Sequence, residues 1–185
     1  MNISFVEWTE SSVSRKGACR CMKEAPVTFH VVPMQEEHAE LICSWQYDPP
    51  YNIYSWLPWE QMKALEVEFG DAQLRQEQYA IVLDQNDRIC GFAQYFPLEG
   101  VTRIGLGMHP ELCGKGQGTA FVTAIVQEAI RRNPTNEIDL EVLTWNTRAI
   151  QVYLKSGFVT QDTYERQTPS GLKPFHCMVY EGPRG

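Results

Sequence analysis

The sequence lacks three features that each mark a class of protein. It contains no apolar run near the roughly 20 residues that a membrane-spanning helix requires, so no membrane partner is expected. Acidic residues outnumber basic ones, 23 to 16, and the formal net charge of -7 argues against a nucleic-acid partner. The 6 cysteines include no Cys-x2-Cys pair, which indicates reduced thiols, no metal site and a cytoplasmic location.

What remains is typical of one globular domain. A chain of 185 residues with 43% hydrophobic residues is long enough to bury its own core. Residues 1–25 show little periodicity and no apolar segment of the secretory type. We therefore expect a poorly structured N-terminal extension over residues 1–25 and a single domain over residues 26–185. An additional edge strand near residues 3–8 is equally consistent with the sequence.

Hydrophobic periodicity predicts the order strand, two helices, three strands, helix, strand, helix and two strands. This order predicts an α/β (α+β) fold, in which helices lie on both faces of a mixed, mostly antiparallel sheet. Strands are predicted at 27–32, 79–83, 89–96, in a segment ending at 108, and at 137–143, 158–164 and 175–180; helices are predicted at 35–46, 59–69, 116–132 and 146–156.

The segment 104–120 organises the rest of the chain. Apolar residues suited to a strand lead through a turn at Pro110 to Gly114, Gly116 and Gly118, after which a helical pattern begins. Glycines at this spacing let main-chain amides converge without obstruction from Cβ atoms, and the helix N-terminus adds its dipole. We therefore predict a binding site for a phosphate or diphosphate. A glycine-rich turn without a ligand is the alternative.

Two common phosphate loops do not fit this segment. A Walker loop, typical of phosphotransferases, requires Gly-x4-Gly-Lys-[Ser/Thr], but Gly116 follows Lys115 here. A Rossmann fingerprint requires a third glycine where Thr119 or Phe121 stands. The segment 113–118 instead resembles the acyl-CoA loop of the GNAT superfamily of N-acetyltransferases, Arg/Gln-x-x-Gly-x-Gly/Ala. Cys113 stands at the Arg/Gln position, which removes one side-chain contact and leaves the main-chain amides unaffected.

A second segment, 146–158, resembles the GNAT motif Asn-x-x-Ala-x-x-x-Tyr-x-x-x-Gly-Phe. Asn146 stands where a helix N-cap belongs, and Ala149 and Tyr153 share one face of the predicted helix. The small Ala149 lets a ligand approach, and Tyr153 places a hydroxyl further along the same groove. Without this context, a half-buried packing tyrosine is the simpler interpretation of Tyr153.

Glu141 lies in the middle of a strand that is expected to be interior to the sheet. The apolar residues of this strand face one way, whereas Asp139 and Glu141 face the other. A carboxylate in such a position needs a partner or a function. The resemblance to GNAT members close to the ribosomal-protein alanine acetyltransferases implies that Glu141 is the general base and Tyr153 the general acid. A salt-bridged strand residue is the alternative interpretation of Glu141.

The resemblance covers about residues 27–180 and implies acetyl-CoA as co-substrate, without a metal or a covalent enzyme intermediate. Main-chain groups of the glycine loop are expected to bind the diphosphate, and those of the preceding strand to pair with pantetheine. The implied cofactor-binding residues are Leu106, Gly107, Met108, Cys113, Gly114, Lys115, Gly116, Gln117, Gly118, Thr119, Ala120 and Asn146.

Together these features predict an N-acetyltransferase that transfers an acetyl, or related short acyl, group to a primary amine by direct attack in a ternary complex. The acceptor is a small molecule or a peptide. The second hypothesis is a non-catalytic GNAT-fold module that holds acyl-CoA as a sensor or docking element. The aromatic, proline-rich loop between Trp45 and Trp59 is the best candidate for the acceptor pocket, where cation–π contacts would hold an amine. The loop is equally consistent with a cover over the core or a homodimer contact.

Overall fold

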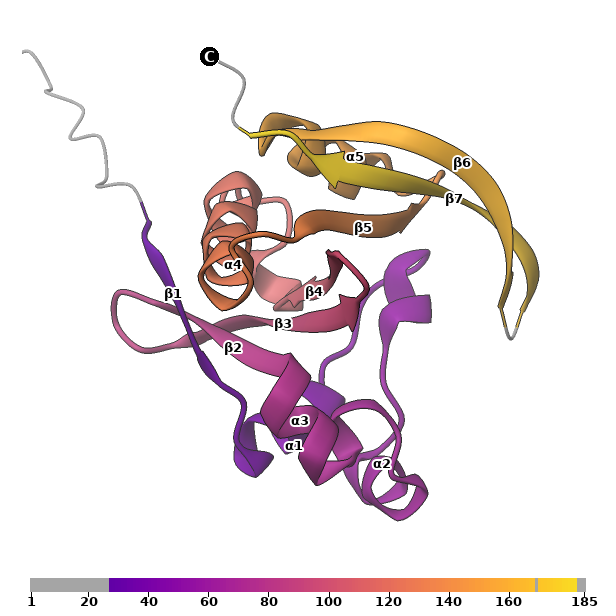
Figure 1. Ribbon diagram of the computed structural model, residues 1–185. Coiled ribbons are helices and arrows are strands. Elements are labelled where there is room, and N and C mark those ends of the chain that lie inside the picture. Colours follow the sequence, from indigo (N-terminus) through magenta and orange to yellow (C-terminus); the bar gives the residue numbers. More distant parts are fainter. Residues whose placement is uncertain (1–26, 169, 183–185) are drawn as a thin grey trace, which may run out of the picture.

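The computed structural model describes residues 27–168 and 170–182, so the expected extension and the alternative edge strand lie outside the described residues (Figure 1). Its centre is a seven-stranded sheet with the order β1-β2-β3-β4-β5-β7-β6. The strands are β1 (Phe29–Pro33), β2 (Tyr79–Asp84), β3 (Ile89–Leu98), β4 (Val101–Met108), β5 (Glu137–Leu143), β6 (Phe158–Thr168) and β7 (Gly171–Tyr180).

Helices cover both faces of this sheet, as the sequence predicted (Figure 1). They are α1 (Glu36–Cys43), α2 (Trp59–Leu65), α3 (Ala72–Gln78), α4 (Gly118–Arg132) and α5 (Thr147–Lys155), with the 3-10 turns η1 (Tyr51–Tyr54), η2 (Glu68–Gly70) and η3 (Pro110–Leu112). Within the described part of the chain, no helix is long and apolar enough to cross a membrane.

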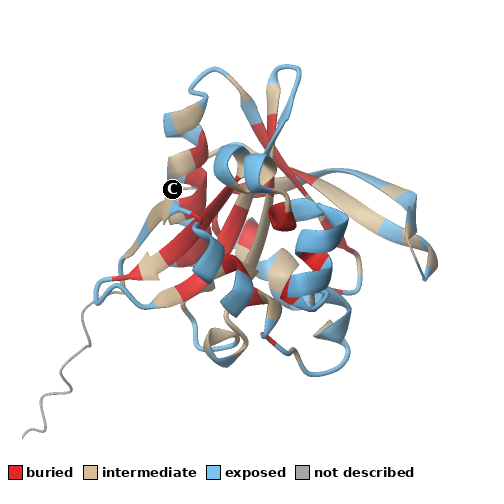
Figure 2. Cartoon of the chain, turned by 90° about the horizontal axis from the view of Figure 1, so that it is seen from below, coloured by how far each residue is buried: buried red, intermediate tan, exposed pale blue. Residues whose placement is uncertain are grey.

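Strand alternation divides the core into two layers. Ala80 and Val82 of β2 pack with α4 and α5, whereas Tyr79 and Ile81 of the same strand pack with α1 and α2. The buried residues therefore lie along the strands and on the inner sides of the helices (Figure 2). The α/β prediction with a mixed, mostly antiparallel sheet is confirmed, because β4 and β5 form its one parallel pair in the described chain.

That parallel pair is short, and this opens the sheet. β4 and β5 pair only where Val101–Arg103 lies beside Glu137–Asp139. Beyond this point β4 stays paired with β3 as far as Met108, and β5 stays paired with β7 as far as Leu143. The two strands therefore diverge, and a V-shaped gap forms between them.

The prediction of one helix over 59–69 is wrong for residues 66–69. Glu66 adopts a left-handed conformation with φ 49°, which ends α2 at Leu65. Gly70 is needed for close packing, since a Cβ atom there would lie 2.2 Å from the Met62 carbonyl oxygen. The sequence analysis did not predict α3, which follows Asp71, an N-cap whose side chain accepts from two amides of the first turn.

The start of α4 also differs from the prediction. The helix begins at Gly118 and not at residue 116, because Gly114 and Gly116 adopt φ values of +78° and +79°. These values lie in the left-handed region, which glycine adopts without a steric cost. The two residues consequently turn the chain so that the next amides point outward at the head of α4.

Candidate functional site

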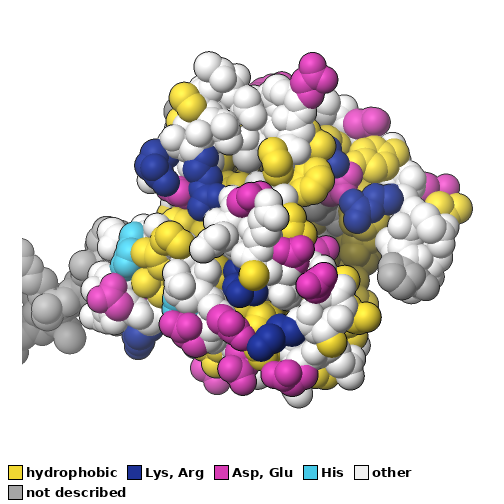
Figure 3. Space-filling view, turned by 60° about the horizontal axis from the view of Figure 1, so that its bottom comes forward, with side chains coloured by type: hydrophobic (Ala, Val, Ile, Leu, Met, Phe, Trp, Pro, Cys, Tyr) yellow, Lys and Arg dark blue, Asp and Glu magenta, His cyan; other side chains and the backbone are white. Residues whose placement is uncertain are grey.

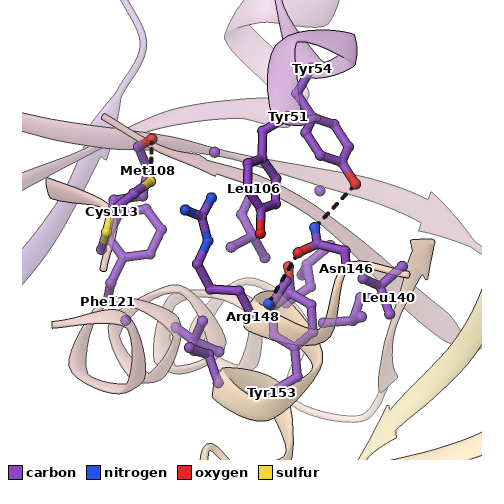
Figure 4. A pocket seen from close by; sticks show the side chains of 18 of the residues that line it. Tyr51, Tyr54, Leu106, Met108, Cys113, Phe121, Leu140, Asn146, Arg148 and Tyr153 are labelled. Atoms are coloured by element: carbon purple, nitrogen blue, oxygen red, sulfur yellow. Dashed lines mark hydrogen bonds between the residues drawn. The ribbon is translucent and has the colours of Figure 1, made fainter. Parts of the chain in front are cut away.

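A cavity of about 690 Å³ occupies the gap between β4 and β5 (Figure 4). Leu106 and Leu140 line it on the face of the sheet that α4 and α5 cover. Gly105 and Glu141, their neighbours along the two strands, line it on the opposite face, toward α1–α3. Because the cavity reaches both faces, two substrates can enter it from opposite sides and meet in the gap.

The glycine loop forms one end of this cavity. Within the described chain, six main-chain N–H groups, those of Gly114 and of residues 116–120, donate to no protein acceptor. The N–H groups of Cys113 and Lys115 donate to carbonyl oxygens of the preceding turn. A Cβ atom on Gly114 or Gly116 would meet nothing within 4 Å, so the approach to these amides is open. Together with the positive end of α4, these donors fit a diphosphate.

The predicted cofactor-binding residues fall into two groups. The residues that line the cavity are Leu106, Gly107, Met108, Cys113, Gly114, Gly116, Gly118, Thr119 and Asn146. Lys115, Gln117 and Ala120 belong to the same loop and helix start but do not line it. Their participation in binding stays a prediction.

The end of β4 directs main-chain groups toward the gap. The amide of His109 donates to the carbonyl oxygen of Cys90 on β3 at 2.8 Å. In an antiparallel pair this directs the main-chain groups of Leu106 and Met108 away from β3 and toward the gap. The Met108 carbonyl oxygen accepts a hydrogen bond from the Tyr47 hydroxyl at 3.0 Å. This edge can pair with an extended ligand in the manner of an added strand.

Asn146 and Tyr153 lie on α5 as the sequence predicted. Oδ1 of Asn146 accepts from the amide of Ala149 at 3.2 Å, which confirms it as the N-cap. The Tyr153 ring is buried against Phe158, with 6.0 Å between ring centroids. Its hydroxyl bonds to no described residue but is not sealed off from the cavity that Tyr153 lines. Burial raises the pKa of Tyr153, so this hydroxyl keeps its proton.

Glu141 lines the cavity from β5, and donors already surround its carboxylate. Nη1 of Arg103 lies 2.9 Å from Oε1, and the Tyr164 hydroxyl and the Arg166 guanidinium also bind the two oxygens. Glu141 is therefore salt-bridged, as the alternative interpretation predicted. A carboxylate offers about four lone-pair sites, so one site is left for a water or an amine. A role as general base stays a prediction.

Arg103 ties Glu141 to a second carboxylate. Its Nε and Nη2 atoms lie 2.9 Å and 2.6 Å from the two oxygens of Asp139, a bidentate pair. These hydrogen bonds raise the pKa of Arg103, so the guanidinium is always charged. Asp139 is only 5% exposed. Arg166, which binds Glu141, supplies the second positive charge. The two carboxylates and two guanidinium groups therefore balance one another.

The aromatic loop spans the two sides of the gap. Tyr47 binds the end of β4, and the Tyr54 hydroxyl accepts from Nδ2 of Asn146 at 3.1 Å (Figure 4). Tyr51, Tyr54 and Trp56 line the cavity, and Trp56 also packs on the core ring of Phe92. The loop thus both borders the cavity and covers the core. A homodimer contact through this loop stays a prediction.

Arg148 is a cavity residue that the sequence analysis missed. Its guanidinium carbon lies 3.8 Å from the centroid of the Tyr51 ring, and no carboxylate in the described chain pairs with it (Figure 4). The helix dipole disfavours a cation in the first turn of α5. An arginine at this place in the sequence is therefore a signal for a bound anion. Burial raises the pKa of the nearby Cys113 thiol, and Arg148 partly offsets this, so Cys113 is a poor nucleophile.

Gln94 and Phe175 also line the cavity on the face of Glu141 and were likewise missed, because isolated strand residues carry no motif. Among the residues described, no three or more His, Cys, Asp or Glu side chains lie together in a way that could hold a metal ion.

Comparison with known proteins agrees with this geometry. The model of the acetyltransferase (GNAT) family matches residues 34–158. No curated protein sequence matches the chain.

Solved structures show the same fold at low identity. A chimera of the spermidine N-acetyltransferase of Vibrio cholerae and hSSAT is 16% identical with a TM-score of 0.66, covering 84% of this chain and 95% of that one. A GNAT-family acetyltransferase from Bacillus anthracis is 11% identical with a TM-score of 0.65, covering 82% and 93%. A ribosomal-protein-alanine N-acetyltransferase from Escherichia coli is 17% identical with a TM-score of 0.58, covering 85% and 96%.

Proposed function

The chain belongs to the GNAT acetyltransferase family and is thus an acetyltransferase, and we propose that it transfers an acetyl group from acetyl-CoA to the primary amine of a small molecule or peptide. The observation that carries this proposal is the set of six free amides at the head of α4, which opens directly into the gap between β4 and β5. We also propose a cytoplasmic location, on the basis of the scattered cysteines.

Binding of the two substrates follows from the two halves of the cavity. The loop amides and the dipole of α4 hold the diphosphate, and Arg148 adds a positive charge beside it. The main-chain groups of Leu106 and Met108 align the pantetheine arm, so that its thioester lies in the gap. An amide of this strand end polarises the acyl carbonyl. The amine enters from the face on which Glu141 lies.

The reaction requires two proton transfers. The acetyl-CoA thioester supplies the acetyl group and a thiolate leaving group. The amine nitrogen attacks the carbonyl carbon, a C–N bond forms and the C–S bond breaks. Glu141 takes the proton from the amine, directly or through a water, at its remaining lone-pair site. Tyr153, which is protonated because it is buried, donates its proton to the thiolate. The proton balance is restored by exchange with solvent.

A non-catalytic acyl-CoA-binding module is the second candidate, because the three donors on Glu141 reduce its capacity to act as a base. Isothermal titration with acetyl-CoA followed by a thiol-release assay over a panel of amines separates the two functions. The proposed enzyme binds acetyl-CoA and releases thiol with at least one class of amine. Binding without thiol release across the panel would support the module.

A further inference from the structure

We propose that the acceptor is a primary monoamine on an uncharged, aromatic or apolar body, and that polyamines are poor acceptors. This inference rests on the proposed function and specifies its acceptor. The evidence lies in the part of the cavity on the α1–α3 face of the sheet, here named the acceptor half. Its lining residues are Trp56, Tyr79, Phe92, Gln94, Gly105, Gly107, Glu141 and Phe175.

Aromatic rings form most of the wall of the acceptor half; Gln94 and Glu141 are polar lining residues, and the Tyr79 hydroxyl donates to Glu68. Trp56 stands 5.9 Å from Phe92 between ring centroids, and Tyr79 and Phe92 are nearly fully buried. On the floor, Gly107 leaves room for the Phe92 ring, since a Cβ atom there would lie 2.4 Å from it. Gly105 likewise carries no side chain into the cavity. Such a surface suits an aromatic or alkyl body, whose burial supplies the binding free energy.

The charge of the acceptor half is already balanced. Among the described residues that line the cavity, Glu141 is the only carboxylate, and Arg103 and Arg166 both bind it. Arg103 also neutralises Asp139 behind it. A single ammonium group can bind at the remaining lone-pair site of Glu141 and release one proton to solvent, which leaves the neutral amine whose second proton Glu141 takes during the attack. A second ammonium group would find no carboxylate in the lining, and burying an unpaired charge is costly.

The rim of the acceptor half carries a positive charge. The guanidinium carbon of Arg166 lies 5.2 Å from the centroid of Phe175, and its side chain is 56% exposed. A polycation that extends from Glu141 past Phe175 would meet this guanidinium at close range. Arg166 is one of the two guanidinium groups that balance Asp139 and Glu141, so the rim belongs to the same charge balance and is not a separate effect.

The outer surface does not provide this selectivity. Residues 34–78, which include α1–α3, contain nine acidic and two basic residues and so account for the whole formal charge of -7. Figure 3 shows acidic side chains gathered over this part of the molecule. This surface attracts cations of every kind at long range. The choice between one charge and several is made inside the acceptor half.

The test uses amines matched in length. With saturating acetyl-CoA, thiol release by the wild-type chain is measured with hexylamine, hexamethylenediamine, phenethylamine and spermidine. We expect kcat/KM for hexylamine and phenethylamine to exceed that for the two polyamines by about ten-fold or more, because only the latter bring an unpaired charge.

A charge-removing variant sharpens the result. Arg166→Gln leaves Glu141 with one guanidinium fewer, so the ratio of diamine to monoamine kcat/KM should rise about five-fold or more. Arg131→Gln, on the exposed side of α4 and paired with Glu128, serves as the control and should leave the ratio unchanged. Thermal unfolding of both variants verifies that they are folded.

Three results would overturn the inference. If the wild-type chain prefers the diamine or spermidine, or if Arg166→Gln leaves the ratio unchanged, the acceptor is not chosen by this charge balance, although the acetyltransferase function stands. If no amine releases thiol while acetyl-CoA binds in titration, the proposed function fails and the inference fails with it.

Discussion

The Tyr54 hydroxyl lies 3.1 Å from Nδ2 of Asn146, and this contact joins the aromatic loop to the first turn of α5. On the other side of the gap, the Tyr47 hydroxyl holds the loop to the Met108 carbonyl oxygen. The loop is therefore fixed to both halves of the divided sheet. It also contributes Trp56 to the lining of the acceptor half.

Tyr54→Phe removes one of these two attachments. We expect the free energy of unfolding to fall by about 1 kcal/mol, the usual net value of one hydrogen bond. Chemical denaturation measures this change. Tyr51→Phe is the matched control, because it lies in the same loop and its hydroxyl bonds to no residue in the described chain. An equal loss in both variants would show that the Asn146 contact contributes nothing specific.

Gly116→Trp should prevent acetyl-CoA binding, because its side chain would cover the free amides of the glycine loop. Isothermal titration should show a loss of affinity of about 100-fold or more, since several charge-assisted hydrogen bonds are lost together. Gly100→Trp is a closely matched control. Gly100 has a φ of +72°, a Cβ atom there would meet nothing within 4 Å, and it lies in the β3–β4 turn, away from the cavity. Equal affinity in the two variants would contradict the diphosphate site.

Tyr153→Phe should lower kcat by about 100-fold, the lower range for loss of a general acid, and should change acetyl-CoA affinity much less. Because burial raises the pKa of Tyr153, the wild-type hydroxyl keeps its proton through and beyond its usual range near 10. The pH profile of kcat should thus show no alkaline decline from this group below about pH 10. Tyr180→Phe, which also packs on Phe158, is the control. Unchanged kcat in Tyr153→Phe would remove this residue from the chemistry.

Much of the fold could be predicted from the sequence because its signals are local. The order of strands and helices followed from periodicity, and the N-cap at Asn146 followed from its place before an amphipathic segment. The glycine loop could be predicted because the spacing of Gly114, Gly116 and Gly118 before a helical pattern is typical of an anion-binding loop; the structure adds that Gly114 and Gly116 have positive φ values. Signals of this kind depend on a few neighbouring residues and need no knowledge of the tertiary structure.

The remaining features depend on contacts between distant segments. Helix α2 ends at Leu65 because Glu66 adopts a left-handed conformation. Glycine or asparagine would have indicated such a conformation in the sequence, but neither stands at this position. The partners of Glu141 come from β4 and from β6, 38 and 25 residues away along the chain. Sequence reasoning could state that Glu141 needed a partner or a function. Only the register of the strands shows that it has partners while it still lines the cavity.

Arg103→Gln tests whether the balanced charges also hold the divided sheet together. Arg103 lies on β4 at its last pairing with β5, opposite Asp139, and it binds both Asp139 and Glu141, which lies two residues further along β5, beyond the paired region. Its loss leaves Asp139, which is 5% exposed, without its bidentate partner. Removing one partner of a buried ion pair costs about 3–5 kcal/mol, so the free energy of unfolding should fall by this amount. Arg131→Gln removes an arginine side chain that is 72% exposed, and Glu128 keeps Arg132 as a partner, so this change should cost less than about 1 kcal/mol. If urea denaturation shows similar small losses for the two variants, Arg103 does not hold the strands at the base of the gap.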